Sequence, residues 1–269
     1  MGASLGGLWV GDRPVLRPWS GQVEDGPFAV ASIVLAPVSN RVSRPFDWGG
    51  GTHTLPRNLA SEAFPIHGDA FGKPWTVARK DPRSIELALG DGAFGPLLYQ
   101  ARLTYEITPE AFSSALTLTS RCNAPMPFGA GFHPWFPHDR DTRIAFSATG
   151  VWLEDDRHLP AGDRPIALPD AWNFATARPL PATWINNGFA DWDRRLRIAQ
   201  GEAAVSLTMH ACRELDTLIL FFPASGADFF CAEPVSHPVD ALNLPGRPGL
   251  AVLEPGETMT VWMRMEWEP

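Results

Sequence analysis

The chain has 269 residues, 45% hydrophobic and 19% charged, so it carries enough apolar material for a sizeable core and is not disordered in composition. Its formal net charge of −8 excludes a general nucleic-acid binder, because the phosphate backbone favours a basic protein surface. The 24 glycines and 27 prolines predict many turns and few long helices.

No segment suits a membrane span or an export signal. The longest apolar run, Phe28–Pro37, has ten residues, about half of what a membrane helix needs. The first nine residues contain neither a basic nor an apolar region, so we expect a cytoplasmic protein. The three cysteines, Cys122, Cys212 and Cys231, are too few and too widely spaced for a disulfide framework or a zinc motif. We expect them to be buried thiols.

Period-two alternation of apolar and polar residues predicts a series of β-strands separated by Gly and Pro turns. No segment keeps a helical period over three turns, and Asn58–Phe64 is expected to form at most one or two helical turns. Strands without intervening helices predict an antiparallel sandwich or barrel. The expected strands, in chain order, are Ser32–Pro37, Ser84–Leu89, Tyr99–Thr108, Ala115–Thr119, Val205–Met209, Leu218–Phe222, Phe229–Ala232 and Thr260–Trp267.

Two regions, Ser43–Phe71 and His133–Asn187, are rich in Pro, Gly, Trp and His and are interpreted as long loops. Loops of that length in a compact domain are usually functional. No shift in composition marks a linker, so we expect a single domain over residues 1–269.

Two polar residues in the first half of the chain are candidates for binding. Arg41 follows the strand ending at Pro37, and an arginine there can donate a pair of hydrogen bonds to a ligand or simply form a surface salt bridge. His67 stands between Pro65 and Gly68, on a tightly defined backbone that can aim its ring at a ligand or into a structural hydrogen bond.

Two residues in the second half complete an acid–base set. His133 is followed by Pro134 and Trp135, which suggests either a histidine beside an aromatic platform for a sugar or an aromatic core cluster. Glu233 ends an apolar strand before Pro234, where partial burial raises its pKa towards that of a general base. The alternative is a glutamate that caps a turn or pairs with an arginine. Together these side chains supply a proton donor, a proton acceptor and groups that hold a polar substrate.

The order of these motifs resembles the aldose 1-epimerase (galactose mutarotase) family. The resemblance covers roughly residues 28 to 265, and the His-Pro-aromatic block and the Glu-Pro block are its more specific parts. The matching pieces are Ser39-Asn40-Arg41, Ile66-His67-Gly68, Gly131–Phe136, Ile185–Phe189, Glu233-Pro234 running to Asn243, and Leu253–Glu257.

The resemblance implies an all-β, galactose-mutarotase-like antiparallel sandwich with few short helices. It implies an isomerase that interconverts the α and β anomers of a free aldose with no cofactor and no metal. His133 would protonate the ring oxygen as general acid, and Glu233 would take the proton of the C1 hydroxyl as general base. Arg41 and His67 would bind the sugar, with Trp135 beside it. The expected partner is a small sugar, not nucleic acid or a membrane, and the expected state is a monomer or homodimer.

One position departs from the family. Where many relatives carry an aspartate that binds sugar hydroxyls, this chain has Asn186, with Asp191 and Asp193 as possible substitutes. An asparagine keeps an acceptor and adds donors but lacks the charge. The preferred sugar therefore stays open.

Two alternatives to the free-sugar enzyme also stay open. A hexose-6-phosphate mutarotase would need a cationic rim, which Arg44, Arg57 and Lys73 could supply. A non-catalytic carbohydrate-binding module on the same fold has no need of the paired His133 and Glu233, so the pair favours catalysis. A metal-dependent barrel is disfavoured, because the histidines lack the spacing that brings ligands to one face of a strand.

Overall fold

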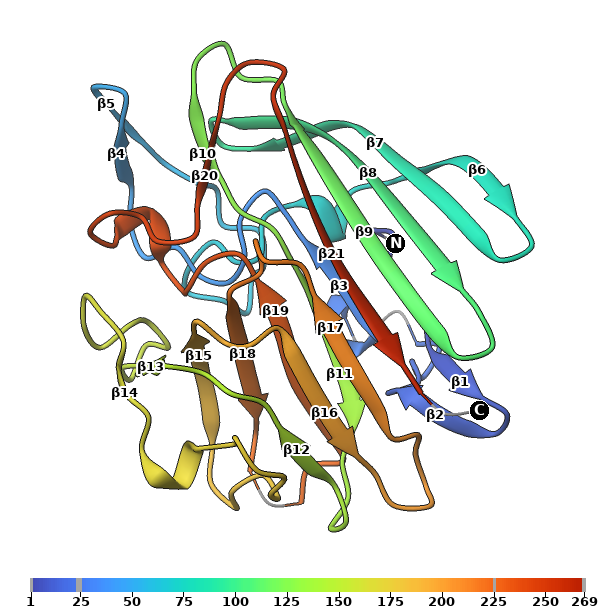
Figure 1. The fold of residues 1–269 in the computed structure, drawn as a ribbon. Helices are drawn as coiled ribbons and strands as arrows, with labels where there is room; N and C mark the ends of the chain where they lie inside the picture. Colours follow the sequence, from blue (N-terminus) through green and yellow to red (C-terminus); the bar gives the residue numbers. More distant parts are fainter. Residues whose placement is uncertain (1, 23–25, 225, 268–269) are drawn as a thin grey trace.

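The computed structural model describes residues 2–22, 26–224 and 226–267. Two large antiparallel sheets dominate the fold (Figure 1). The seven-stranded sheet, called the site sheet below, has the strand order β14-β13-β15-β18-β19-β11-β3. The eight-stranded sheet, called the back sheet, has the order β12-β16-β17-β21-β9-β8-β7-β6. This arrangement confirms the predicted all-β antiparallel sandwich.

The strands of the two sheets have the following bounds. The site sheet consists of β3 (Ser32–Leu35), β11 (Gly131–Pro137), β13 (Gly150–Trp152), β14 (Ile166–Ala167), β15 (Ile185–Ala190), β18 (Thr217–Phe222) and β19 (Phe229–Val235). The back sheet consists of β6 (Thr76–Asp81), β7 (Ser84–Phe94), β8 (Leu97–Ile107), β9 (Ala111–Ser120), β12 (Arg143–Ala145), β16 (Arg195–Ala199), β17 (Leu207–Ala211) and β21 (Thr258–Glu266).

Short ribbons and single turns of 3₁₀ helix complete the described chain. The two-stranded ribbons pair β1 (Leu8–Val10) with β2 (Arg13–Leu16), β4 (Phe46–Trp48) with β5 (Gly51–His53), and β10 (Met126–Phe128) with β20 (Ala251–Leu253). The 3₁₀ turns are η2 (Pro27–Ala29), η3 (Ala70–Gly72), η4 (Asp170–Trp172) and η5 (Ala241–Asn243). No helix in the described ranges has the length and apolarity that a membrane span requires.

Alternation along the site sheet separates two hydrophobic clusters. On β11, Phe132 and Phe136 belong to the main core, whereas Trp135 belongs to a smaller cluster. On β19, Phe230 belongs to the main core and Cys231 to the smaller cluster. Because successive side chains of a strand point to opposite faces, the smaller cluster lies on the outer face of the site sheet. That face therefore carries the odd-numbered residues of β11 and β19.

The strands predicted from alternation are confirmed, with longer bounds in most cases. Residues Asn58–Phe64 form turns and bends, within the expected limit of one or two helical turns. Two other predictions were wrong in part. The region Ser43–Phe71 is largely loop, yet it contains β4 and β5. The region His133–Asn187 is not one loop, because it begins inside β11 and includes β12 to β14.

Proline explains the misplaced strand boundaries. Pro134 lies inside β11 and Pro234 inside β19, although proline is normally confined to strand edges because it lacks an N–H for the ladder. The β11–β19 ladder pairs Gly131 with Val235 and Trp135 with Cys231 but skips the pairs between them. The sheet thus accommodates both prolines at a gap in its hydrogen bonding. His133 and Glu233 both lie within strands, although the sequence suggested a loop for His133 and a strand end for Glu233.

Candidate active site

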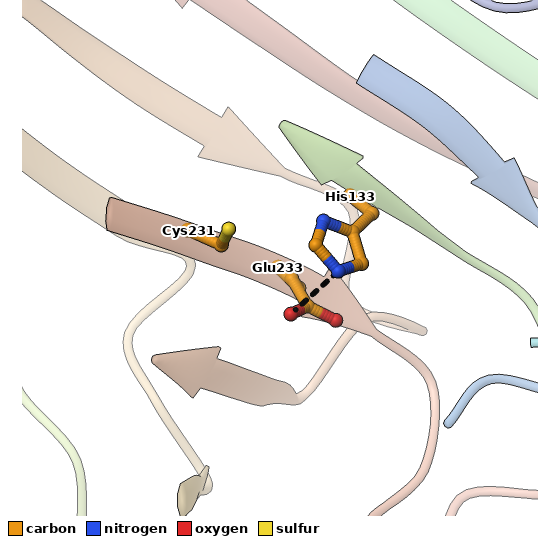
Figure 2. A group of neighbouring side chains, drawn as sticks. All are labelled: His133, Cys231 and Glu233. Atoms are coloured by element: carbon orange, nitrogen blue, oxygen red, sulfur yellow. Dashed lines mark ion pairs between the residues drawn. The ribbon is translucent and has the colours of Figure 1, made fainter. Parts of the chain in front are cut away.

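His133 and Glu233 face each other at the centre of the site sheet. The register on either side of the ladder gap places them opposite one another on adjacent strands. His133 Nε2 lies 3.1 Å from Glu233 Oε1, as Figure 2 shows. Only 8% of His133 and 2% of Glu233 is exposed, so the contact is shielded from bulk water. The structure therefore brings the two predicted catalytic residues into direct contact.

Burial perturbs both groups in opposite directions. Desolvation lowers the pKa of His133 to about 3 and raises the pKa of Glu233 to about 8. At neutral pH these opposite shifts favour a single proton on the pair, carried by the carboxyl group beside a neutral imidazole. Within the part of the chain that the structure describes, Glu233 Oε2 is buried without a hydrogen-bond partner. A buried acceptor without a partner is costly unless a ligand satisfies it.

His67 is held as a neutral donor beside the pair. The backbone N–H of Asn40 donates to His67 Nδ1 at 3.0 Å, and the backbone N–H of His67 donates to the Asn40 carbonyl at 3.0 Å. Because Nδ1 accepts, the ring proton of the neutral imidazole lies on Nε2. Burial, reinforced by His133 and Arg41, lowers the pKa of His67 well below its ordinary value. The rings of His67 and His133 meet edge to face with centroids 5.2 Å apart.

The backbone at this corner is strained in a way that serves the site. Asn40 has a φ of 51° and His67 a φ of 60°, in the left-handed region that non-glycine residues seldom occupy. Gly68 follows with a φ of 69°, and a Cβ there would lie 1.9 Å from the Ala36 carbonyl oxygen. Only glycine fits that approach. The Pro-Ile-His-Gly motif thus encodes the turn that aims His67.

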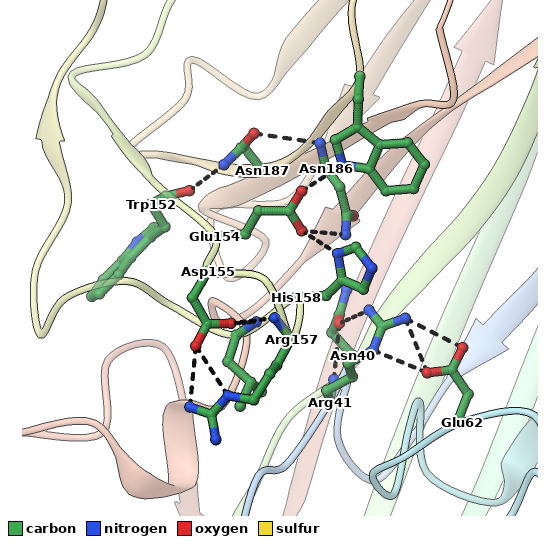
Figure 3. A network of polar contacts seen from close by, with 12 residues as sticks. Asn40, Arg41, Glu62, Trp152, Glu154, Asp155, Arg157, His158, Asn186 and Asn187 are labelled. Atoms are coloured by element: carbon green, nitrogen blue, oxygen red, sulfur yellow. Dashed lines mark hydrogen bonds and ion pairs between the residues drawn. The ribbon is translucent and has the colours of Figure 1, made fainter.

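Arg41 is anchored by a carboxylate that the sequence analysis did not single out. Its Nε and Nη2 donate to the two oxygens of Glu62 at 3.0 and 3.2 Å (Figure 3). The positive charge of Arg41 counteracts the burial that raises the pKa of Glu233. Arg41 therefore favours the ionised carboxylate that a general base requires. The ion pair expected as an alternative exists, and it orients the guanidinium at the pocket.

Asn186 lines the opposite side of the pocket and contacts a second unforeseen carboxylate. Its Nδ2 donates to Glu154 Oε2 at 2.8 Å, and His158 Nδ1 contacts the same oxygen at 2.8 Å (Figure 3). Asp191 and Asp193 follow the other end of β15, outside the pocket lining. The carboxylate that lines the pocket on this side is Asp156, whereas Glu154 holds Asn186 from outside the lining.

Trp135 forms part of the pocket wall and supports the acid–base pair. Its ring stacks on His133 with centroids 3.9 Å apart, and it is 3% exposed. Phe28 lies beside both rings, with its centroid 6.2 Å from that of His133 and 6.2 Å from that of Trp135. The pocket has a volume of about 770 Å³, within the usual range for small-molecule sites. Its lining includes all six predicted site residues, Arg41, His67, His133, Trp135, Asn186 and Glu233.

The structure also shows functional residues that sequence reasoning missed. His237 Nε2 accepts from the Ser39 N–H at 3.0 Å, and its Nδ1 lies 2.8 Å from the Pro238 carbonyl, so His237 holds the start of the Arg41 loop. The Arg17 guanidinium lines the pocket although no local motif marks it. The Ser39–His237 contact joins residues 198 positions apart in the sequence. In the sequence only the His237-Pro238 segment pointed to such a residue, and its contact with Ser39 could be found only from the structure.

The cations proposed for a phosphate rim do not line this pocket. Arg44 lines a separate cavity, Arg57 donates to the Ala60 and Glu62 carbonyls, and Lys73 pairs with Asp69. The expected rim of Arg44, Arg57 and Lys73 is therefore not assembled around the acid–base pair.

One group of side chains in the described ranges has the donor types and spacing to hold a metal ion. The ligand atoms of His133, Cys231 and Glu233 lie within 4.8 Å of one another (Figure 2). Nitrogen, sulfur and oxygen donors of this kind suit Zn²⁺. All three cysteines are free and buried, as expected. In the structure His133 Nε2 contacts Glu233 directly, which suits proton transfer between the two groups.

Comparison with known proteins places this geometry in a family. The family model described as aldose 1-epimerase matches residues 1–266. A relative from Escherichia coli K12, named Uncharacterized protein YphB, is 33% identical over 277 residues, covering 99% of this chain and 93% of the relative. A crystal structure from Escherichia coli K12, assigned provisionally as an aldose 1-epimerase, superposes with a TM-score of 0.91 at 31% identity, covering 99% of this chain and 93% of that one.

More distant structures share the fold. A galactose mutarotase-like protein from Clostridium acetobutylicum superposes with a TM-score of 0.86 at 19% identity, covering 100% of this chain and 90% of that one. The GalM/aldose epimerase homologue from C. elegans has a TM-score of 0.82 at 16% identity, covering 99% and 93%. These two likenesses concern the fold alone. With the family match over nearly its whole length, the chain belongs to the aldose 1-epimerase family.

Proposed function

We propose that this protein is an aldose 1-epimerase that interconverts the α and β anomers of a free aldose. The observation that carries the proposal is the 3.1 Å contact between two buried groups, His133 and Glu233, in a pocket of about 770 Å³. Opening a cyclic hemiacetal requires one proton to be removed and one to be supplied. A pair that holds a single proton performs both tasks.

The reaction follows from the proton count. A proton shift along the His133–Glu233 contact gives an imidazolium and a carboxylate without changing the net charge. Glu233 then takes the proton of the C1 hydroxyl, the C1 carbonyl forms, the bond from C1 to the ring oxygen breaks, and His133 protonates that oxygen. The pair is left as a carboxylic acid and a neutral imidazole, the same state that burial favours in the empty pocket.

Reclosure uses the same two groups with their roles exchanged. Rotation about the C1–C2 bond presents the other face of the carbonyl. Glu233 returns its proton to the carbonyl oxygen while His133 takes the proton of the attacking hydroxyl. The opposite anomer forms, and one pair serves both directions of the reaction.

The remaining pocket residues bind and orient the sugar. His67 Nε2–H is a neutral donor aimed beside the pair, and Arg41 supplies positive charge that favours the ionised Glu233. Asn186 offers a donor and an acceptor for hydroxyls on the far side, and Glu154 holds its amide in place. Phe28 offers an aromatic surface that suits the apolar C–H groups of a sugar, while Trp135 packs against His133 in the pocket wall.

The test is anomerisation of freshly dissolved sugars. We expect the protein to speed the approach of α-glucose or α-galactose to equilibrium in polarimetry well above the rate in buffer. A binding module would bind sugar without changing that rate. The absence of any acceleration over a panel of free and phosphorylated aldoses would contradict the proposal.

A further inference from the structure

Arg17 is a half-buried cation in the wall of the candidate active site. Its Nη2 donates to the carbonyls of Phe28 and Val30, at 2.7 and 3.5 Å. Its guanidinium carbon lies 4.4 Å from the ring centre of Phe229 and 5.4 Å from that of Trp135. These contacts fix the position of the charge, and Asp228 acts on it electrostatically without forming an ion pair.

The other arginines of the pocket already have acidic partners. Arg41 pairs with Glu62 and Arg157 with Asp155. Among the residues that the structure describes, Arg17 has no carboxylate within salt-bridge distance, since every ion pair involves other cations. Charges withdrawn from water are normally paired. An unpaired guanidinium in a ligand pocket therefore indicates an anionic group on the ligand.

The position of Arg17 relative to the acid–base pair suits one sugar. Trp135 follows His133 by two residues on β11, and Phe229 precedes Glu233 by four residues on β19, all on the same face of the sheet. Two residues span about 7 Å along a strand. Four residues span about 13 Å, so Arg17, above Trp135 and Phe229, is displaced along the strands from the reacting centre by roughly 7 to 13 Å. That span suits a hexose ring whose exocyclic carbon carries a further group.

We infer that the substrate sugar carries one anionic group, a carboxylate or a phosphate, that pairs with Arg17 while C1 lies at His133 and Glu233. The inference rests on the proposed function and narrows its substrate class. A guanidinium suits either group because its planar N–H donors match the oxygens of both. The anion would then lie at the pocket wall beside Trp135 and Phe229, and not at the rim proposed from Arg44, Arg57 and Lys73.

The experiment compares charged and neutral sugars of the same size. Anomer exchange at equilibrium is measured by NMR magnetisation transfer for D-glucuronate, D-glucose 6-phosphate and D-glucose. The proteins are the wild type, Arg17→Met, Arg17→Lys and Arg213→Met, the last a control that removes one exposed positive charge far from the pocket. Near-ultraviolet circular dichroism shows whether each variant is folded.

The expected result is a charge-specific loss. The wild type prefers one anionic sugar over glucose in kcat/KM, and Arg17→Met reduces that preference by about ten- to hundredfold, the worth of a charge-assisted hydrogen bond. Arg17→Lys retains part of the preference, and Arg213→Met retains all of it. Glucuronate and glucose 6-phosphate distinguish a carboxylate from a phosphate substrate.

Two results would overturn the inference. One is a wild type that prefers glucose to both anionic sugars, a result that refutes the inference even if Arg17→Met does not fold. The other is an equal loss for all three sugars in folded Arg17→Met, which would assign Arg17 a structural role. In both cases the epimerase activity itself would stand. If no sugar exchanged, calorimetric binding of glucuronate against glucose to wild type and Arg17→Met would still decide the role of Arg17.

Discussion

Replacing Glu233 by glutamine separates the stability of the fold from its chemistry. Glutamine has nearly the shape of a protonated glutamate, so it fills the same space beside His133 and presents an amide donor to Nε2. It cannot ionise, and it cannot accept the proton of a C1 hydroxyl. We expect Glu233→Gln to lose about 10²- to 10⁴-fold in kcat while still binding sugar.

The same substitution should stabilise the protein at neutral pH. Burial raises the pKa of Glu233 from 4.5 to about 8, so its contribution to stability is complete below pH 4.5 and is lost progressively as the pH rises towards 8. At pH 7 the unfolded carboxyl is ionised and the folded one is not. The difference of about 2.5 pH units corresponds to at most about 3 kcal/mol, a cost that the glutamine variant avoids.

Thermal unfolding measures this gain directly. For a chain of 269 residues, about 3 kcal/mol corresponds to a rise in Tm of roughly 5 °C at pH 7. The rise should shrink as the pH approaches 4.5, where the folded and unfolded wild type both hold the proton. Glu214→Gln is the matched control, because Glu214 is exposed and Arg213 lowers its pKa.

The opposite sign would refute the reasoning. If Glu233 and His133 formed a stable ion pair in the empty pocket, removing one charge would leave the other buried and unpaired. Glu233→Gln would then lower the Tm at pH 7, and the loss would diminish at low pH. A variant of unchanged stability across the range would equally contradict a carboxyl group that burial holds protonated.

Three further expectations concern the pair and its supports. The pH profile of kcat/KM should be bell-shaped. Below the lower pKa, about 3, the pair has no proton acceptor, and above the upper pKa, about 8, it has no proton donor. A kcat/KM that stays constant from pH 8 to 9 would contradict the assignment. A chelator should leave activity unchanged, whereas added Zn²⁺ should inhibit the enzyme by binding His133, Cys231 and Glu233. As a control, Cys231→Ala should have normal activity without Zn²⁺ and should be inhibited less when Zn²⁺ is added. His237→Leu should lower stability by about 1 to 3 kcal/mol in urea unfolding, because it leaves the Ser39 N–H without its acceptor, and full stability would show that another acceptor replaces the ring.

Alternation and motif order predicted most of the strands and candidate site residues of this chain, because each pattern reflects a local physical cause. Apolar and polar residues alternate along the strands because one face of each strand packs on the core. The turn at His67 and Gly68 is marked locally by the flanking Pro65 and by the glycine, which favours a left-handed backbone. The resemblance identified Arg41, His67, His133 and Glu233, and the structure brings all four to one pocket. Their catalytic and binding roles stay predictions.

What the sequence did not reveal depends on contacts between distant segments. Pro234 suggested a strand end and His133-Pro134 the start of a loop, because nothing local shows that the ladder of β11 and β19 has a gap there. Glu62, Glu154 and Arg17 gain their roles only from neighbours that the fold supplies. Glu62 and Glu154 lie in regions interpreted as long loops, where the spacing of residues does not show which side chains meet.

The position of the acid–base pair on two neighbouring inner strands divides the molecule into a fixed and an adjustable part. A shift of β19 by one residue would turn Glu233 into the main core and break the interior packing of Phe230, so the distance between acid and base is protected by the stability of the whole sandwich. The groups around the sugar instead come from connections near residues 40, 62, 67 and 154–158, which can change length or sequence without moving the sheet. Exchanging these connections with those of a relative should alter which sugar is accepted while leaving the proton chemistry in place.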